Sequence, residues 1–205
     1  PELLDWLSRW FVDNGWSPKK LHRLIVTSAA YRRGGDPPDP ERAKATDPGN
    51  ALLAAFPPRR LTAEEIRDAM LAASGELTRA VGGPSVFPEI HPEVAFQPRL
   101  LMGKLGPPYE ASPKRADRNR RSVYAARIRG LADPLFEVLN RPGGDLSCER
   151  RDETTVAPQA LTLFHGRFAH TRALALAMSV AKATPVEADR VAAAFRRVLG
   201  RPPTD

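Results

Sequence analysis

Residues 61–75 read L-T-A-E-E-I-R-D-A-M-L-A-A-S-G, and they carry the clearest helix signals in the chain. Thr62 is the predicted N-cap, and Glu65, three residues later, completes a capping box in which the two residues satisfy each other's free backbone N–H groups. Gly75 is the predicted C-cap, because glycine tolerates the left-handed conformation that ends many helices. The face that we expect to be buried consists of Ile66, Ala69, Met70 and Ala73.

Two more helices are predicted before this one. Residues 2–13 place their apolar side chains at helical spacing, and Asn14-Gly15 ends the pattern. Ser17 is then an N-cap, and Pro18 occupies the first position of a second helix. Because a tight turn joins the two helices, we expect an antiparallel αα-hairpin.

Further helices are predicted after residue 130. They cover residues 131–139, a segment that begins at Pro158, and a segment that runs from a break at Gly166 to about Ala183. Thr184 and Glu187 form a second capping box, and Gly200 ends the helix that this box opens. The expected core face of this last helix consists of Val191, Phe195, Val198 and Leu199.

Two long segments without helical periodicity separate these helices. They are residues 34–50 and residues 84–120, which are polar and contain many prolines. Only residues 122–128 have the composition of a short strand. The sequence therefore predicts a mainly α, irregular helical domain with long proline-rich loops and at most one short strand or hairpin. We expect residues 1–205 to form a single domain, cut from a longer multidomain chain.

Composition narrows the classes of function. The 205 residues are 42% hydrophobic, which is enough for a buried core. No run approaches the roughly 18 apolar residues of a membrane span, so none is expected.

Cys148 is the single cysteine, which excludes an internal disulfide and a zinc site of paired cysteines. The four histidines lack metal-site spacing, and no phosphate-binding glycine loop or serine-hydrolase elbow is present. No catalytic residue or metal ligand is predicted, and whether the chain is an enzyme stays open.

Most of the net charge of +7 comes from one basic segment. Residues 114–129 hold seven basic residues and one acid, Asp117. Clustered arginines share the cost of removing water from an anion, so we predict anion binding by Arg120, Arg121 and Arg151. The anion could be a phosphate, a sulfated or carboxylated glycan, nucleic acid or an acidic partner surface. Nucleic acid is the least favoured, because only Tyr124 offers a stacking platform. The alternative is a solvated loop, or arginines paired within the chain.

The most polar run that leads into a helix is S-C-E-R-R-D-E-T-T at residues 147–155. The candidate pocket residues are Tyr124, Cys148, Thr154, Thr155 and Gln159. Cys148 would be a nucleophile if His165 or His170 served as its base. A structural or buried cysteine is the simpler alternative.

Several motifs follow one another along nearly the whole chain. They include W-S-x-K-x-L-H-R-L-I-V at residues 16–26, R-R-L-x-A-E-x-I-R-D-A at 59–69, R-R-S-V-Y at 120–124, C-x-x-R-x-x-T-T-x-x-P-Q-A-L at 148–161 and F-R-x-V-L-G-R-P-P at 195–203. In this order they resemble a planctomycete and verrucomicrobial domain of unknown function. The chain departs from that pattern at L-N-R-P (139–142), where the family tends to have F-D-x-P, and at L-F-H (163–165), where it tends to have L-L-N.

The resemblance implies a context rather than an activity. Such domains follow another uncharacterised domain in large exported proteins, which implies a periplasmic or secreted location, and a cytochrome-c-like haem module often lies nearer the N-terminus. No haem c is expected in this chain, which has no Cys-x-x-Cys-His. We therefore predict a non-catalytic interaction or scaffold module whose partners are neighbouring domains of the same parent chain.

Two alternatives stay open. In the first, the chain is part of an enzyme that acts on an anionic polysaccharide, either sulfated or carboxylated. This alternative requires Arg121, Arg151 and Gln159 to converge in one pocket. The second is an accessory domain to a haem c electron-transfer module.

Overall fold

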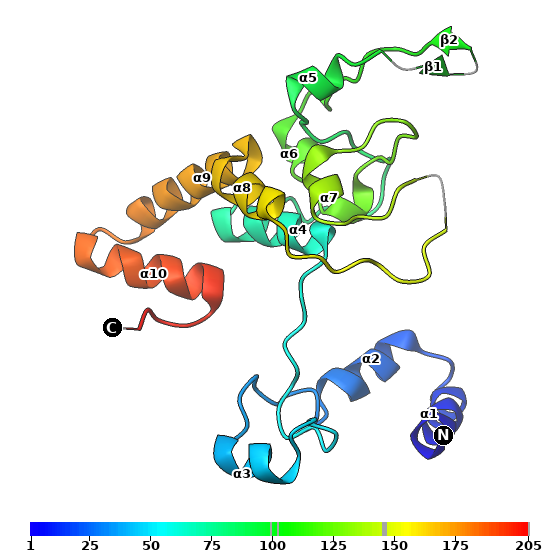
Figure 1. The fold of residues 1–205 in the computed structure, drawn as a ribbon, viewed down its shortest axis with the longest axis vertical. Coiled ribbons are helices and arrows are strands. Elements are labelled where there is room, and N and C mark those ends of the chain that lie inside the picture. Colours follow the sequence, from blue (N-terminus) through cyan, green and yellow to red (C-terminus); the bar gives the residue numbers. More distant parts are fainter. Residues whose placement is uncertain (99, 102, 145–146, 205) are drawn as a thin grey trace. The chain divides into compact units, whose positions relative to one another are not determined.

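The computed structural model describes residues 1–98, 100, 101, 103–144 and 147–204. In chain order these residues form α1 (Glu2–Asp13), α2 (Pro18–Val26), α3 (Pro40–Thr46), α4 (Ala63–Ser74), α5 (Pro92–Ala95), β1 (Leu100–Leu101), β2 (Lys104–Leu105), α6 (Arg115–Arg118), the 3₁₀ turn η1 (Ser122–Tyr124), α7 (Pro134–Val138), α8 (Ala157–His165), α9 (Arg167–Ala183) and α10 (Glu187–Leu199) (Figure 1). Strands β1 and β2 pair in an antiparallel hairpin. The predicted mainly α fold with at most one hairpin is confirmed.

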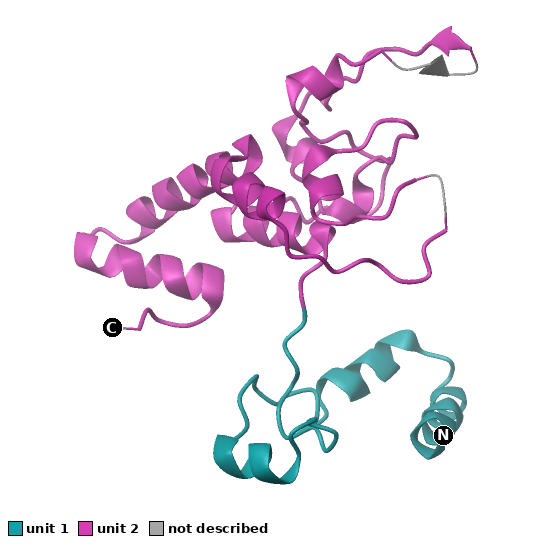
Figure 2. Ribbon diagram, in the orientation of Figure 1, with its two compact units in different colours: residues 1–59 teal, residues 60–205 magenta. Residues whose placement is uncertain are grey.

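The chain divides into two compact units, residues 1–59 and residues 60–205 (Figure 2). We call them unit 1 and unit 2. The prediction that the whole chain acts as one domain stays a prediction.

Unit 1 contains α1, α2 and α3, and local signals place its helix ends. Ser17 caps α2 by accepting a hydrogen bond from the backbone N–H of Lys20, as predicted. Gly15 adopts φ +76° at the turn between α1 and α2, a conformation that favours glycine. Helix α3 lies within the segment 34–50 that was predicted to be a loop. No residue in 1–59 is buried, so the predicted αα-hairpin has no buried core of its own.

Unit 2 is organised around α4 and α9. Helix α9 packs against α4, α8 and α10, and α7 packs against α8 and α4 (Figure 1). A core cluster is formed by Ala63, Ala125, Phe136 and Leu139, with Ile66, Leu135 and Val138 packed against it. The buried side chains of the described residues therefore all lie in unit 2.

Helix α4 begins and ends as predicted. The Thr62–Glu65 capping box is present, and Gly75 is a left-handed C-cap. The predicted buried face is wrong, however. The buried residues of the helix are Ala63, Arg67, Leu71 and Ser74, whereas Ala69 is exposed and Ile66, Met70 and Ala73 are only partly buried. The helix turns Arg67 inward because the loop after α6 presents carbonyl oxygens that need a donor.

Residues 84–128 are irregular, with two short helices and the β1–β2 hairpin within residues 84–120. The strand predicted at residues 122–128 is wrong. Those residues begin as the 3₁₀ turn η1 and then form isolated bridges, in which Ala125 pairs with Val86 and Ile128 with Leu131. These bridges are isolated, and the N–H of Ala125 bonds locally to the carbonyl oxygen of Ser122, so no continuous ladder forms.

Helix α10 begins later than predicted. Its N-cap is Val186 rather than Thr184, whose carbonyl oxygen instead accepts a hydrogen bond from Arg190 Nε at 3.0 Å. Gly200 ends the helix with φ +69°, as predicted. The predicted core face is wrong, since Val191, Val198 and Leu199 are exposed. Within the described residues, no helix combines the length and the apolar character needed to cross a bilayer.

Candidate functional site

A cavity of about 390 Å³ opens in unit 2 where segments far apart in sequence meet. Its lining comes from α4, α6, α9, the residue before α9, the start of α7 and the segment before α5. Five arginines line it, Arg67, Arg115, Arg118, Arg167 and Arg172. We call this space the arginine cavity. Two of its arginines, Arg115 and Arg118, belong to the basic segment 114–129.

Arg67 forms the inner wall of the arginine cavity. Its side chain is only 2% exposed. It donates to the carbonyl oxygens of Arg118 at 2.7 Å and Arg120 at 3.0 Å, and to Ser122 Oγ at 3.1 Å. Burial lowers the pKa of its guanidinium, while the nearby carboxylates of Asp68 and Asp133 counteract this. Arg67 therefore fixes the segment between α6 and η1 against α4.

Glu76 holds two further arginines in place. Arg172 Nη1 lies 2.8 Å from Glu76 Oε2, and Arg115 Nη2 pairs with Glu76 Oε1. Arg118 donates to the carbonyl oxygens of Ser112 and Pro113. These contacts orient the guanidinium groups before any ligand is present.

One side of the cavity is apolar. Phe168 contacts two cations, with Arg67 Cζ 5.6 Å and Arg172 Cζ 5.3 Å from the ring centroid. Ile90, Pro134 and Leu135 extend this surface. The cavity therefore combines positive charge with an apolar wall.

The N-terminus of α9 forms another side. Gly166 is required here, because a Cβ atom at this position would lie 2.2 Å from the carbonyl oxygen of Thr162. The N–H groups of Arg167, Phe168 and Ala169 belong to the first helical turn, where a helix has no acceptor of its own, and no side chain caps them. All of these residues line the arginine cavity.

Two carboxylates, Glu89 and Asp133, also line the cavity. Glu89 Oε1 pairs with Arg167 Nη2 at 3.1 Å, with both side chains largely exposed. Asp133 caps α7 by accepting from the N–H of Leu135 at 3.0 Å. Burial raises the pKa of Asp133, although its hydrogen bonds and the charge of Arg67 lower it in part.

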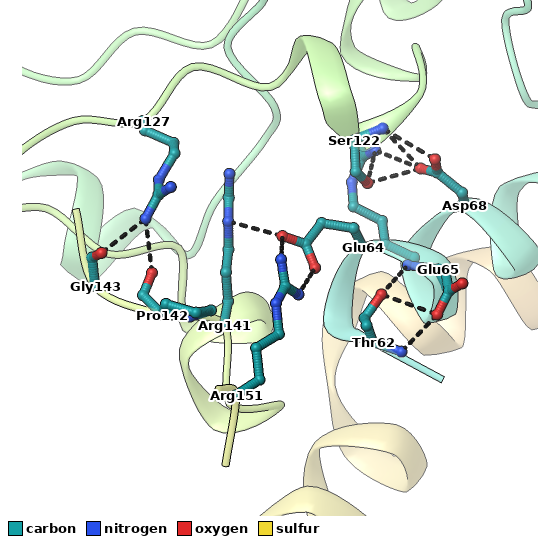
Figure 3. Close-up of polar contacts among 11 residues, drawn as sticks. Thr62, Glu64, Glu65, Asp68, Ser122, Arg127, Arg141, Pro142, Gly143 and Arg151 are labelled. Carbon is teal, nitrogen blue, oxygen red and sulfur yellow. Dashed lines mark hydrogen bonds and ion pairs between the residues drawn. The ribbon is translucent and has the colours of Figure 1, made fainter. Parts of the chain in front are cut away.

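A second polar cluster lies at the N-terminal end of α4 (Figure 3). Arg151 forms a bidentate ion pair with Glu64, with Nη1 2.6 Å from Oε2 and Nη2 3.3 Å from Oε1. Arg141 Nε lies 3.3 Å from Glu64 Oε1. Burial would raise the pKa of Glu64, but the hydrogen bond from Arg151 and the charges of Arg151 and Arg141 outweigh it, so the pKa is lowered. Asp68 accepts hydrogen bonds from the N–H and hydroxyl of Ser122, at 2.8 and 2.6 Å. These residues line a second, more open cavity of about 580 Å³.

Arg120 and Arg121, which were predicted to bind an anion, lie outside both cavities. Arg120 is 6% exposed, and its guanidinium donates to the carbonyl oxygens of Ala80, Gly82 and Pro84. It also stacks on Tyr124, with 3.9 Å to the ring centroid. Arg121 lies over the same ring, with its Cζ 5.9 Å from the centroid, and is exposed.

The remaining candidate pocket residues are divided between two places. Thr154, Thr155 and Gln159 surround Arg60, which donates to all three. Cys148 is exposed, and its thiol donates to the carbonyl oxygen of Arg150. The structure therefore does not bring Arg121, Arg151 and Gln159 into one cavity, and their anion-binding role stays a prediction.

Sequence reasoning did not single out Arg67 or Arg172. Arg67 lies four residues from both Ala63 and Leu71, so helical spacing could have placed it on the buried face. For Arg172 no comparable local signal exists, since its partner Glu76 is remote in sequence. Among the described residues, no three histidine, cysteine or acidic side chains lie close enough to share a metal ion.

Comparison with known proteins gives one match. The family described as PSD1, a protein of unknown function (DUF1553), matches residues 1–205. No curated protein and no solved structure matches the chain. The match spans every residue, in agreement with the resemblance to a domain of unknown function. The chain therefore belongs to the PSD1 family of proteins of unknown function (DUF1553).

Proposed function

We propose that this chain is a non-catalytic interaction or scaffold module, in which unit 1 presents apolar helix faces to a partner. One observation carries this proposal. Residues 1–59 contain no buried side chain, yet they show large apolar side chains at 40–79% exposure. These are Leu3, Leu4, Trp6, Val12, Trp16, Ile25, Val26, Tyr31, Leu52, Leu53 and Phe56. Apolar surface of this extent is typical of an interface with another protein or domain.

The use of arginine in unit 2 supports a scaffold role. Arg118, Arg120 and Arg127 all belong to the basic segment, and all three donate to backbone carbonyl oxygens of the chain itself. Such bonds hold loops that lack regular secondary structure. The positive charge of the segment thus serves in part to order residues 80–143.

The proposed partner is a neighbouring domain of the same exported parent protein, as the family resemblance implies. A haem-bearing neighbour would be one such partner. The chain by itself is then expected to be colourless, and its location periplasmic or secreted.

Amide hydrogen exchange tests the interaction. In the 205-residue chain alone, the amides of α1 and α2 should exchange rapidly, because no core protects them. In a longer family protein that includes the preceding domain, the same amides should exchange at least about tenfold more slowly. Equal protection in both proteins would contradict the proposal, since the apolar faces would then need no partner.

Turnover tests the non-catalytic role. The chain should convert no substrate in a broad screen of glycans and esters. Reproducible turnover that survives repurification would overturn the proposal.

The alternative of an enzyme acting on an anionic polysaccharide receives less support from the geometry. It requires Arg121, Arg151 and Gln159 to share a pocket. Arg151 lines the open cavity beside Glu64, whereas Gln159 binds Arg60 and Arg121 borders Tyr124.

A further inference from the structure

We infer that the arginine cavity binds a small organic carboxylate, whose charged end meets the guanidinium groups and the N-terminus of α9 and whose apolar body lies on Phe168. This ligand site goes beyond the proposed function, because it lies in unit 2 and does not depend on the exposed faces of unit 1. The cavity's size of about 390 Å³ falls in the range of small-molecule sites.

The charge balance of the cavity favours an anion. Five guanidinium groups line it, against the carboxylates of Glu89 and Asp133. Glu76, which pairs with Arg115 and Arg172, and Asp68, which lies 3.5 Å from Arg67 Nη1, neutralise two more charges. A positive excess of one remains, and a planar carboxylate matches the fork of an arginine side chain.

Several donors are available to such a ligand. Arg115 and Arg167 are 64% and 65% exposed, so part of each guanidinium faces water. Asn119 is only 7% exposed and lines the cavity, and its Oδ1 accepts from Arg172 Nη1 at 3.4 Å.

The uncapped first turn of α9 adds to these donors. Free N–H groups at a helix N-terminus favour a negative charge. Because Gly166, Arg167, Phe168 and Ala169 all line the cavity, this end of the helix borders the same space as the guanidinium groups.

The apolar wall decides between an organic and an inorganic anion. Ile90, Pro134, Leu135 and Phe168 offer surface that a bare sulfate or phosphate would leave unused. Burying the body of an organic ligand there removes apolar area from water, which stabilises the complex.

A titration with three probes tests this inference on the whole chain. Benzoate supplies a carboxylate and a ring, benzamide supplies the ring without the charge, and inorganic sulfate supplies charge without an apolar body. Binding is followed by amide chemical shifts of residues 115–119 and 166–172. Benzoate should bind at least about tenfold more tightly than benzamide, the ratio expected for losing a charge-assisted hydrogen bond. Sulfate should bind more weakly than benzoate.

Two variants and a matched control locate the site. Asn119→Asp keeps the shape of the side chain but adds a negative charge, and it should weaken benzoate binding about tenfold or more. Arg167→Gln removes an exposed cavity arginine and should weaken binding about threefold to tenfold. Arg121→Gln removes the same charge from the basic segment outside the cavity, and it should change binding by less than about twofold because of screening.

Several results would overturn the inference. They are an absence of benzoate binding, equal affinity for benzamide or for sulfate, and an equal loss of affinity in Arg121→Gln and Arg167→Gln. Thermal unfolding of each variant shows whether the fold is kept. Because Arg167 is mostly exposed, its variant stays informative even if Asn119→Asp unfolds.

Discussion

Arg67 is a charged residue at the centre of a helical core. Its guanidinium is 2% exposed and connects α4 to residues 118–122 through three hydrogen bonds. Buried charges persist only when their donors are satisfied, and here two of the acceptors are backbone carbonyl oxygens. Arg67 is thus one of the side chains that hold the irregular segment after α6, together with Asp68, which accepts hydrogen bonds from Ser122.

Replacing Arg67 by methionine should destabilise unit 2 by about 3 kcal/mol or more, because two carbonyl oxygens and a hydroxyl lose their donor inside the protein. Urea unfolding followed by circular dichroism measures the change. Arg79→Met, at an exposed position, is the control and should change the free energy of unfolding by less than about 0.5 kcal/mol. Equal stability of the two variants would show that the Arg67 contacts contribute little.

Tyr109 should titrate at a higher pH than Tyr124. Burial raises its pKa to about 12, and the charge of Asp133 adds to this. Its hydroxyl donates to the carbonyl oxygen of Pro88. Tyr124 has the opposite shift, since the N–H of Gly82 donates to its hydroxyl and lowers its pKa.

Ultraviolet absorbance during an alkaline titration checks this difference. Tyr109→Phe should remove a component near pH 12, and Tyr124→Phe should remove a component that lies below the ordinary tyrosine range. Because the folded pKa of Tyr109 lies above the ordinary value of about 10, stability should fall as the pH rises from about 10 to 12. A single transition unaffected by Tyr109→Phe would contradict the assignment.

At the scale of elements, the junction of α8 and α9 depends on one glycine. The N–H of Gly166 donates to the carbonyl oxygen of Thr162 at 2.9 Å, and an added Cβ would lie 2.2 Å from that oxygen. Gly166→Ala should therefore shift the two helices apart and cost about 2 kcal/mol or more. Chemical denaturation measures it against Gly143→Ala, where a Cβ meets nothing within 4 Å. Similar stabilities would argue against the close approach.

The contact between α4 and the 141–151 segment should respond to acid. The pKa of Glu64 is lowered, so its contribution to stability is fully present above its ordinary value, about 4.3, and is lost as the pH falls through the folded pKa. Glu64→Gln should reduce stability at neutral pH by about 1 kcal/mol, because Arg151 is partly exposed and its charge is screened. The variant should also be less sensitive to acid.

The unfolding temperature of each variant, measured between about pH 3 and 7, reports this effect. Glu149→Gln, at an exposed position, serves as the matched control and should keep the pH dependence of the natural sequence. If both variants lose stability in parallel as the pH falls, the Glu64 carboxylate is not responsible.

At the scale of the whole molecule, the buried side chains of the described residues all lie in unit 2. A chain of residues 60–205 should therefore unfold cooperatively, with a Tm within about 4 °C of the full chain, which corresponds to about 1 kcal/mol for a unit of this size. Calorimetry of the two proteins checks this. Loss of the cooperative transition would show that residues 1–59 contribute to the stability of unit 2.

Several helix ends were determined by the sequence alone. The Thr62–Glu65 capping box, the Ser17 cap and the glycines Gly75 and Gly200 all lie where local signals place them. Caps join residues at most a few positions apart, so their energetics depend little on the rest of the fold. The same locality accounts for the correct mainly α class.

Only the tertiary structure decided which faces are buried and which charges meet. Helical periodicity placed Ile66 and Ala69 inward, yet the unmet carbonyl oxygens near residue 120 turned Arg67 inward instead. Likewise the arginine cavity assembles residues from about 67 to 172, a span that no local pattern connects. Burial and pairing depend on which segments become neighbours, and that depends on the summed free energy of many remote contacts rather than on the spacing of residues within one helix.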